Sequence, residues 1–243
     1  MKKVPKSDQV PTKPYQPLIL RIIHNIQGIM IIMAIITAFW TYNTYDGRFG
    51  KISLLPPWEE IEGIHGTFGL FTLLIFPIFV VYVIHRGNKK IIQSNTLNQL
   101  KLVNKPIWWY SLHRLTNTLI IFALTFAVFT GKMMDENWLP EGELNHFWYY
   151  LHLISLILMV FMIGSHLLMN VKIGNYPLIL SMLDAQIREK DSYNLWWQNI
   201  IFFQQNWLNI VKTQWDELSP HFKLLEITIL FIIISAWLIS IIK

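Results

Sequence analysis

Long apolar stretches separated by polar connections dominate the sequence. Five of them approach the roughly 20 residues that an α-helix needs to cross a bilayer: residues 18–40, 61–84, 112–129, 147–169 and 224–242. We therefore predict an all-α membrane protein. The first four stretches would form a four-helix core within residues 18–172, and the last would be a C-terminal transmembrane helix.

The composition supports a membrane protein. Hydrophobic residues make up 53% of the 243 residues and charged residues only 14%, whereas soluble domains carry about 25% charged residues. The sequence contains no Cys. This excludes disulfides, iron–sulfur clusters and c-type haem, which is attached through a Cys-x-x-Cys-His motif.

Basic residues near the ends of the apolar stretches predict the orientation in the membrane. Residues 1–17 are basic and contain four prolines, which is typical of a solvated tail. Residues 85–105 carry basic residues and no acidic residue. The connections 41–60 and 130–146 are mostly acidic. The N-terminus is therefore expected on the cytoplasmic side, and the last helix is expected to end outside.

Residues 173–223 form an aromatic-rich segment on the predicted cytoplasmic side. Trp196, Ile200, Phe203, Trp207 and Ile210 recur at helical spacing. This pattern predicts an amphipathic helix, residues 195–215, that lies in the membrane interface. A docking surface for a partner subunit is the second interpretation, and the two are compatible.

Histidines inside a membrane segment indicate function because ionisable side chains there are costly. His152 and His166 lie 14 residues apart on one predicted helix. They are therefore about 40° apart around the helix and roughly 21 Å apart along it. One helix face thus offers an imidazole near each membrane surface, which suits two stacked haems.

Two further histidines match these depths. His24 lies near the cytoplasmic start of the first helix and pairs in depth with His166, while His65 lies near the outer start of the second helix and pairs with His152. Iron with two imidazole ligands has no open position for oxygen or substrate, which is the arrangement for electron transfer. We therefore predict two haem b groups with these four axial ligands. The alternative is that the histidines only tie helices together by hydrogen bonds.

Other polar residues near the cytoplasmic end are weaker candidates. Propionate partners would be Arg21, Arg114 and His113, with Lys132 and Arg48 on the outer side. His113 is also an alternative ligand in place of His24. A quinone needs a hydrogen-bonding group near a haem edge, and the candidates are Asn25, Gln27, Asn117 and Asn170.

The pattern resembles the bacterial cytochrome b561 family and the b-type cytochrome subunits of membrane-bound formate dehydrogenase and nickel–iron hydrogenase. The matching motifs are RIIHNIQG around His24, IEGIHGTFG around His65, and YLHLISLILMVFMIGSHLL, which holds His152 and His166. The resemblance covers roughly residues 15–172. It implies a four-helix core with two b haems in a bacterial inner or thylakoid-type membrane, and electron exchange with quinone. The additional C-terminal residues favour a subunit that docks a partner on its cytoplasmic side and on the C-terminal helix.

Two other functions compete with an electron carrier between quinone and a redox partner. One is a stand-alone quinone-linked oxidoreductase, such as a superoxide oxidase, which would turn over without a partner. The other is a transport or structural subunit without haem. Broken helix pairs, which are typical of ion-coupled carriers, are not evident in the sequence. Nucleic acid is not an expected partner.

Overall fold

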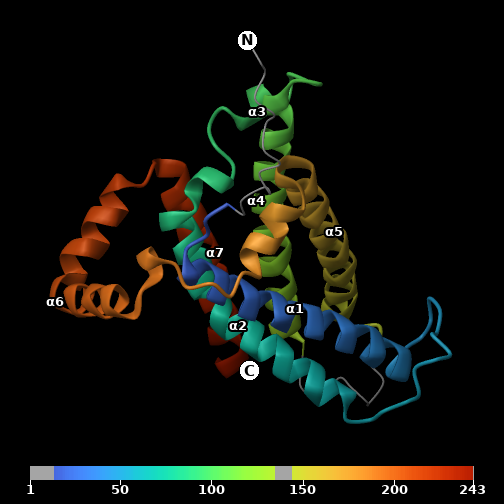
Figure 1. Cartoon of the computed structure of the whole chain (residues 1–243). Coiled ribbons are helices and arrows are strands. Elements are labelled where there is room, and N and C mark those ends of the chain that lie inside the picture. Colours follow the sequence, from blue (N-terminus) through green and yellow to red (C-terminus); the bar gives the residue numbers. More distant parts are fainter. Residues whose placement is uncertain (1–13, 135–143, 243) are drawn as a thin grey trace.

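The computed structural model describes residues 14–134 and 144–242, and there it contains helices and no strand (Figure 1). The predicted basic tail therefore lies mostly outside the described residues, as does part of the acidic connection at 130–146. The long helices are α1 (Leu18–Tyr45), α2 (Ile61–Arg86), α4 (Pro106–Met133), α5 (Phe147–Met182), α6 (Tyr193–Glu217) and α7 (Pro220–Ile242). The short ones are η1 (Asn88–Lys90), α3 (Thr96–Gln99) and η2 (Glu189–Asp191).

Five of the long helices, α1, α2, α4, α5 and α7, have the length and apolar composition to cross a membrane. This confirms the predicted all-α membrane fold. The helices run further than the apolar stretches alone indicate. α4 begins at Pro106, because proline suits the first turn of a helix, where its missing N–H leaves no bond unmade.

α5 passes residue 172, where we expected the core to end. It continues to Met182 across a kink at Asn175, whose φ of 51° is left-handed. Pro177 follows two residues later, and proline cannot donate the backbone hydrogen bond that would continue a straight helix. The kink turns the end of α5 back toward the start of α1, as the hydrogen bonds of Arg21 to residues 184 and 186 show.

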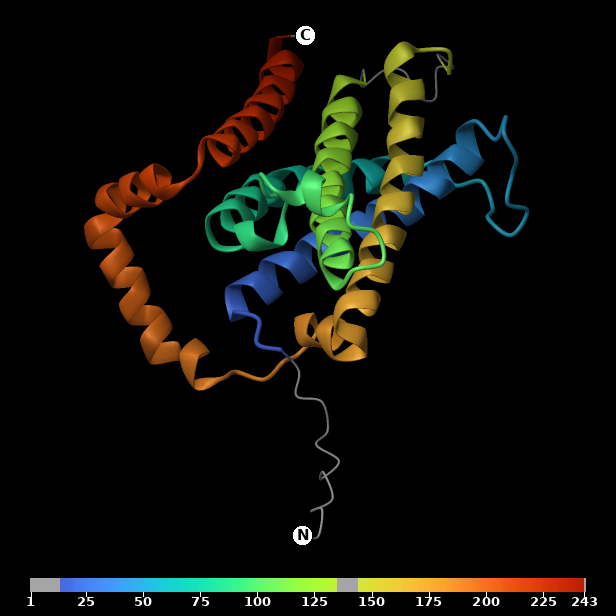
Figure 2. The ribbon, with the colours of Figure 1, turned by 90° about the horizontal axis from the view of Figure 1, so that it is seen from above.

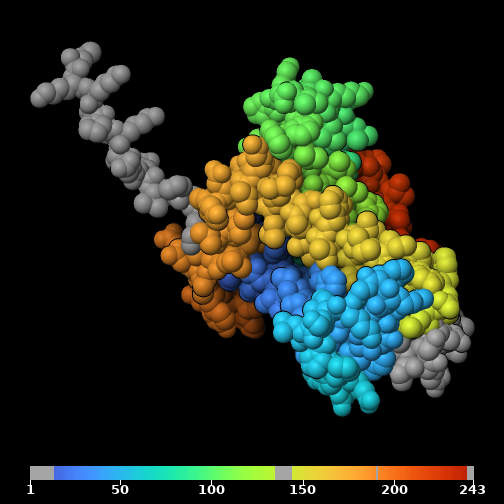
Figure 3. All heavy atoms as spheres, turned by 90° about the vertical axis from the view of Figure 1, so that its right-hand side faces the viewer, coloured from blue at the N-terminus to red at the C-terminus, as the bar shows by residue number. Residues whose placement is uncertain are grey.

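The core consists of two antiparallel helix pairs. α1 packs on α2, and α4 packs on α5, and in Figure 1 the first pair runs obliquely across the second. α5 also contacts α1, and Figure 3 shows it beside α1 on the face opposite α7. α7 packs against both α2 and α4. Its apolar side chains Ile229 and Ile233 join Phe76, Val80 and Ile121 in the buried cluster.

The predicted helix at residues 195–215 is present as α6. It stands apart from the four core helices in two perpendicular views (Figures 1 and 2), and η2 is the described element with which it has most contact. None of its residues is buried. The arm formed by η2 and α6 therefore connects the end of α5 to α7 by a path outside the bundle.

Candidate functional site

Four histidines meet as two pairs, one toward each end of the bundle. The rings of His24 on α1 and His166 on α5 have centres 6.2 Å apart, and we call them the His24 pair. The rings of His65 on α2 and His152 on α5 have centres 6.0 Å apart and form the His65 pair. α5 contributes one imidazole to each pair. These are the two pairs expected from helix depth.

The ring separations fit two imidazoles that share one metal ion. When two imidazoles bind one metal ion from opposite sides with metal–nitrogen bonds of about 2 Å, their ring centres lie roughly 6 to 6.5 Å apart. Within the described residues, no group of three or more His, Asp or Glu side chains gathers to hold a bare metal ion. Each pair thus offers two ligands on opposite sides, which suits a metal whose other ligands belong to a macrocycle such as haem.

A cavity of about 460 Å³ surrounds the His65 pair. Gly66, Gly69 and Gly131 line it. A Cβ on Gly66 or Gly69 would meet no described atom within 4 Å, whereas one on Gly131 would lie 3.0 Å from Cε1 of His152. The glycines of α2 therefore leave space beside the imidazoles, and Gly131 lets α4 approach the His152 ring closely.

Two threonines orient the imidazoles of the His65 pair, and sequence reasoning missed them. Thr37 donates its hydroxyl to the Met33 carbonyl at 2.7 Å, and its Oγ1 lies 3.2 Å from Nδ1 of His65. The Ala34 carbonyl lies 3.0 Å from the same nitrogen. A hydroxyl has one proton to donate, so Nδ1 of His65 must be the donor. Its Nε2 is then free to bind a metal.

His152 on α5 is oriented in the same way by a threonine of α4. Thr130 donates to the Phe126 carbonyl at 2.8 Å, and its Oγ1 lies 3.1 Å from Nδ1 of His152. Hydrogen bonds of this kind fix the tautomer and the ring direction of metal-binding histidines. The sequence signal was a threonine near the end of an apolar stretch: Thr37 lies within 18–40, and Thr130 directly follows 112–129. Threonine also bonds its own helix backbone, so the signal is weak.

Amide side chains surround the His24 pair. Oδ1 of Asn117 lies 3.0 Å from Nδ1 of His166, and Nδ2 of Asn117 donates to the Lys90 carbonyl at 2.8 Å. Asn170 donates to the His166 carbonyl at 2.7 Å. Nε2 of His113 lies 3.3 Å from Oδ1 of Asn170, so His113 belongs to this network. The imidazole that pairs with His166 is that of His24.

Two of the four predicted quinone residues therefore hold His166. Of the other two, Asn25 donates to the Met182 carbonyl at 2.8 Å, and Gln27 donates to the Thr72 carbonyl at 3.4 Å. Oε1 of Gln27 and Nδ1 of His24 are buried without a hydrogen-bond partner among the described residues. Both atoms therefore still need a partner.

The predicted propionate partners contact protein groups. Arg21 is 4% exposed and donates to the backbone carbonyls of Asp184 and Gln186. It also forms an ion pair with Asp191 at 3.4 Å. Nε of Arg114 donates to the Lys89 carbonyl at 3.1 Å. Arg21 thus fastens the segment after α5 to the start of α1.

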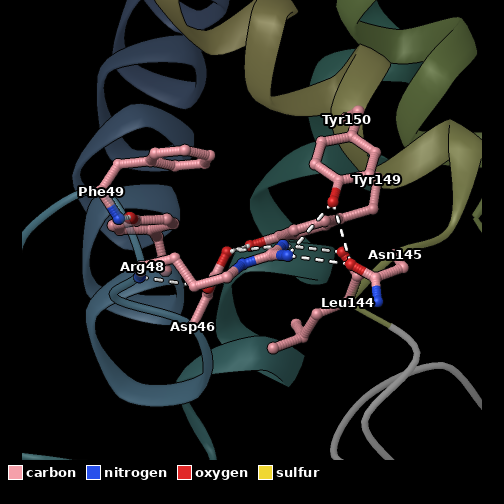
Figure 4. A network of polar contacts seen from close by, with 8 residues as sticks. Asp46, Arg48, Phe49, Leu144, Asn145, Tyr149 and Tyr150 are labelled. Carbon is pink, nitrogen blue, oxygen red and sulfur yellow. Dashed lines mark hydrogen bonds and ion pairs between the residues drawn. The ribbon is translucent and has the colours of Figure 1, made fainter.

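A polar network closes the other end of the bundle beside the His65 pair (Figure 4). Nε of Arg48 lies 2.7 Å from Oδ1 of Asp46, and Tyr149, which also lines the cavity, donates to Oδ2 of Asp46 at 2.6 Å. The same guanidinium reaches Tyr150 and Asn145. Burial alone would raise the pKa of Asp46, but hydrogen bonds from Arg48 and Tyr149 outweigh it and hold the pKa below its usual value.

A buried pair of ionisable residues joins α2 to α7, and the sequence reading passed over it because it placed the acidic residues in connections. Nε2 of His85 lies 3.0 Å and 3.3 Å from the two carboxyl oxygens of Glu226. The side chains are 12% and 6% exposed. Glu226 was inside a predicted membrane helix, which is itself the signal that could have identified it.

Comparison with known proteins agrees with this geometry. A family model described as prokaryotic cytochrome b561 matches residues 15–185, which include both histidine pairs and end beyond the kink in α5. Searches of curated proteins and of solved structures find no match. Members of the matched family bind haem b and transfer electrons in membranes. The two imidazole pairs on the candidate membrane-crossing helices are suited to hold such a group. Since the match spans most of the chain, the protein belongs to the prokaryotic cytochrome b561 family.

Proposed function

We propose that this protein is a di-haem b-type cytochrome that carries electrons across the membrane between quinone and a partner redox protein. The observation that carries the proposal is a pair of imidazoles toward each end of the bundle. The ring centres are 6.2 Å apart in one pair and 6.0 Å apart in the other. The cytoplasmic side is assigned to the His24 end, because the basic connection between α2 and α4 lies there.

Each histidine has a defined part in this function. The His24 pair would hold one haem and the His65 pair the other. Bound haem would supply one-electron oxidation and reduction, and two imidazoles bound to each iron would leave no open position for oxygen or substrate. Thr37, Thr130 and Asn117 each contact Nδ1 of one of these imidazoles. A proton held on Nδ1 leaves Nε2 unprotonated and able to bind a metal.

We assign quinone exchange to the His24 end. Gln27 is the supporting residue, because its Oε1 is a buried acceptor without a partner among the described residues. An amide oxygen can accept a hydrogen bond from a quinol hydroxyl. Gln27 lies three residues after His24, so it follows the ligand on the same stretch of α1. A soluble or membrane-bound redox partner would take the electron at the other haem.

The test is a pyridine haemochrome assay on detergent-purified protein, followed by a reduced-minus-oxidised spectrum. We expect about two protohaems per chain with low-spin b-type bands. A water-soluble quinol should then reduce the haem in a stopped-flow experiment, and Gln27→Leu should slow this reduction without loss of haem. Folded protein that contains no haem would overturn the proposal.

Thr130→Val should weaken haem binding at the His65 pair alone. The substitution removes the hydroxyl that accepts from Nδ1 of His152, and loss of such an orienting bond typically lowers metal affinity about 10- to 100-fold. Haem dissociation into apomyoglobin measures the effect. Thr125→Val is the matched control, since buried Thr125 on the same helix bonds only the Ile121 carbonyl at 2.8 Å. Equal haem retention in the two variants would contradict the orienting role.

A further inference from the structure

α6 carries two chemically different faces. At 100° per residue, ten apolar or aromatic side chains fall on one half of the helix surface. Those on this face include Trp196, Trp197, Trp207, Leu208 and Val211, which are between 44% and 63% exposed. A face of this size in water would be unfavourable, so it needs a covering partner.

The opposite half of α6 is polar but lacks a basic cluster. Asn and Gln supply six of its thirteen side chains, and the three charged residues of the helix, Lys212, Asp216 and Glu217, also lie on it. Helices that bind anionic surfaces place several Lys or Arg on the polar face. Amide side chains instead suit water and headgroups of any charge. The composition of α6 therefore indicates that its apolar face, and not charge on its polar face, binds the partner.

Both ends of α6 are fixed near one membrane surface. At its start, Asp191 of η2 bonds Arg21 and the backbone N–H of Leu18 at the beginning of α1. At its end, Glu217 is separated from α7 by two residues, and α7 is a candidate membrane span. α6 therefore lies at the level where α1 and α7 enter the bilayer. Because both of its ends are attached there, its apolar face can reach the membrane–water interface without diffusing to it.

An apolar cleft continues the exposed stripe of α1 toward this arm. Ile187, Tyr193 and Trp196 form one wall, and the first turns of α1 form the other. The cavity is about 490 Å³. On α1 the next residues of the same stripe, Ile26 and Ile29, are 42% and 55% exposed. A stripe of this kind on a membrane-crossing helix faces acyl chains, and the cleft extends that surface to the foot of α6.

We propose that α6 is a bilayer-surface helix. Its tryptophan-rich face lies in the phospholipid leaflet at the His24 end, and acyl chains fill the cleft between α1 and the arm. Its amide face is turned to water. A protein that docked on the apolar face would first have to lift α6 out of the membrane to which α7 ties it. Because the polar face lacks a basic cluster, attachment does not depend on anionic lipid.

The absence of cysteine from the sequence allows a direct test with single-cysteine variants that carry a nitroxide label. Ile200→Cys and Val211→Cys probe the apolar face, and Gln198→Cys and Asn209→Cys probe the amide face. The labelled proteins are placed in phosphatidylcholine nanodiscs, and relaxation by oxygen is compared with relaxation by a water-soluble nickel chelate. Ile32→Cys, on the exposed stripe of α1, and Ser94→Cys, in a connection, give the lipid and water limits.

We expect the oxygen-to-nickel ratio to be roughly tenfold higher at Ile200 and Val211 than at Gln198 and Asn209, as for a helix in the interface plane. Replacing half of the lipid with phosphatidylglycerol should leave the ratios unchanged. Equal ratios on both faces would overturn the proposal and place α6 in water. Low accessibility to both reagents at Ile200 and Val211 would indicate a protein cover, and spin–spin broadening would indicate a second copy of this chain. Monodisperse elution and an unchanged helical circular dichroism spectrum in the same samples show that the variants fold, so the outcome is independent of the electron-transfer proposal.

Discussion

His152→Ala protein is expected to retain about one haem per chain and to lose the haem of the His65 pair. The imidazole of His152 would supply one of the two protein bonds to the iron, and its removal would also enlarge the cavity that Gly131 lines. His166→Ala should remove the other haem instead. The two variants should therefore have equal haem content but different reduced spectra and midpoint potentials.

The measurement is the pyridine haemochrome assay combined with a redox titration of each variant. His221→Ala is the control, because His221 is exposed at the start of α7 and contacts Ser219; it should retain both haems. Loss of both haems from a folded single variant would show that the two sites do not load independently. Retention of both would refute axial ligation by the substituted histidine.

His85→Leu should destabilise the packing of α7 strongly. The substitution leaves the carboxyl group of Glu226 buried between helices without its imidazole partner, and a buried polar group left without its hydrogen bond typically costs about 1–3 kcal/mol. The double variant His85→Leu/Glu226→Leu should recover most of this loss, because two apolar side chains need no hydrogen-bond partner there. Unfolding in mixed detergent, followed by circular dichroism, measures the free energy of each variant.

The unsubstituted protein, the single variants His85→Leu and Glu226→Leu, and the double variant form a double-mutant cycle, which gives the coupling between His85 and Glu226 directly. Thr228→Leu is the control on the same helix, since Thr228 is exposed and its replacement should change stability little. If His85→Leu unfolds with a free energy within about 1 kcal/mol of the unsubstituted protein, water or a neighbouring group satisfies Glu226 and the pair does not hold α7.

Much of the fold could be predicted because a bilayer imposes strict local rules. A membrane helix must satisfy its own backbone and present apolar side chains over a fixed length, so the five spans were visible as stretches of sequence. The extensions of α4 to Pro106 and of α5 to Met182 were not visible. Outside the hydrocarbon region, helix ends depend on local capping and on packing, as the kink at Asn175 illustrates.

The histidine pairs were predictable for a related reason. The rise of a helix is constant, so the position of each histidine within its span sets its depth, which gave the levels of His24 and His65. The 14-residue spacing of His152 and His166 places both on one face of α5. The groups behind the imidazoles were not predictable. Thr37, Thr130 and Asn117 lie on helices α1 and α4, and each reaches a histidine of a different helix.

The sequence by itself determined the membrane class, the depth of each histidine and the amphipathic character of α6, because these properties depend on spacing along one helix. Only the tertiary structure decided which faces meet. It placed Asn117 behind His166, Arg21 on the segment after α5, and His85 against Glu226, residues between 49 and 163 positions apart in the chain. Such contacts depend on how helices cross and rotate against one another, and that is set by the packing of side chains from several helices together.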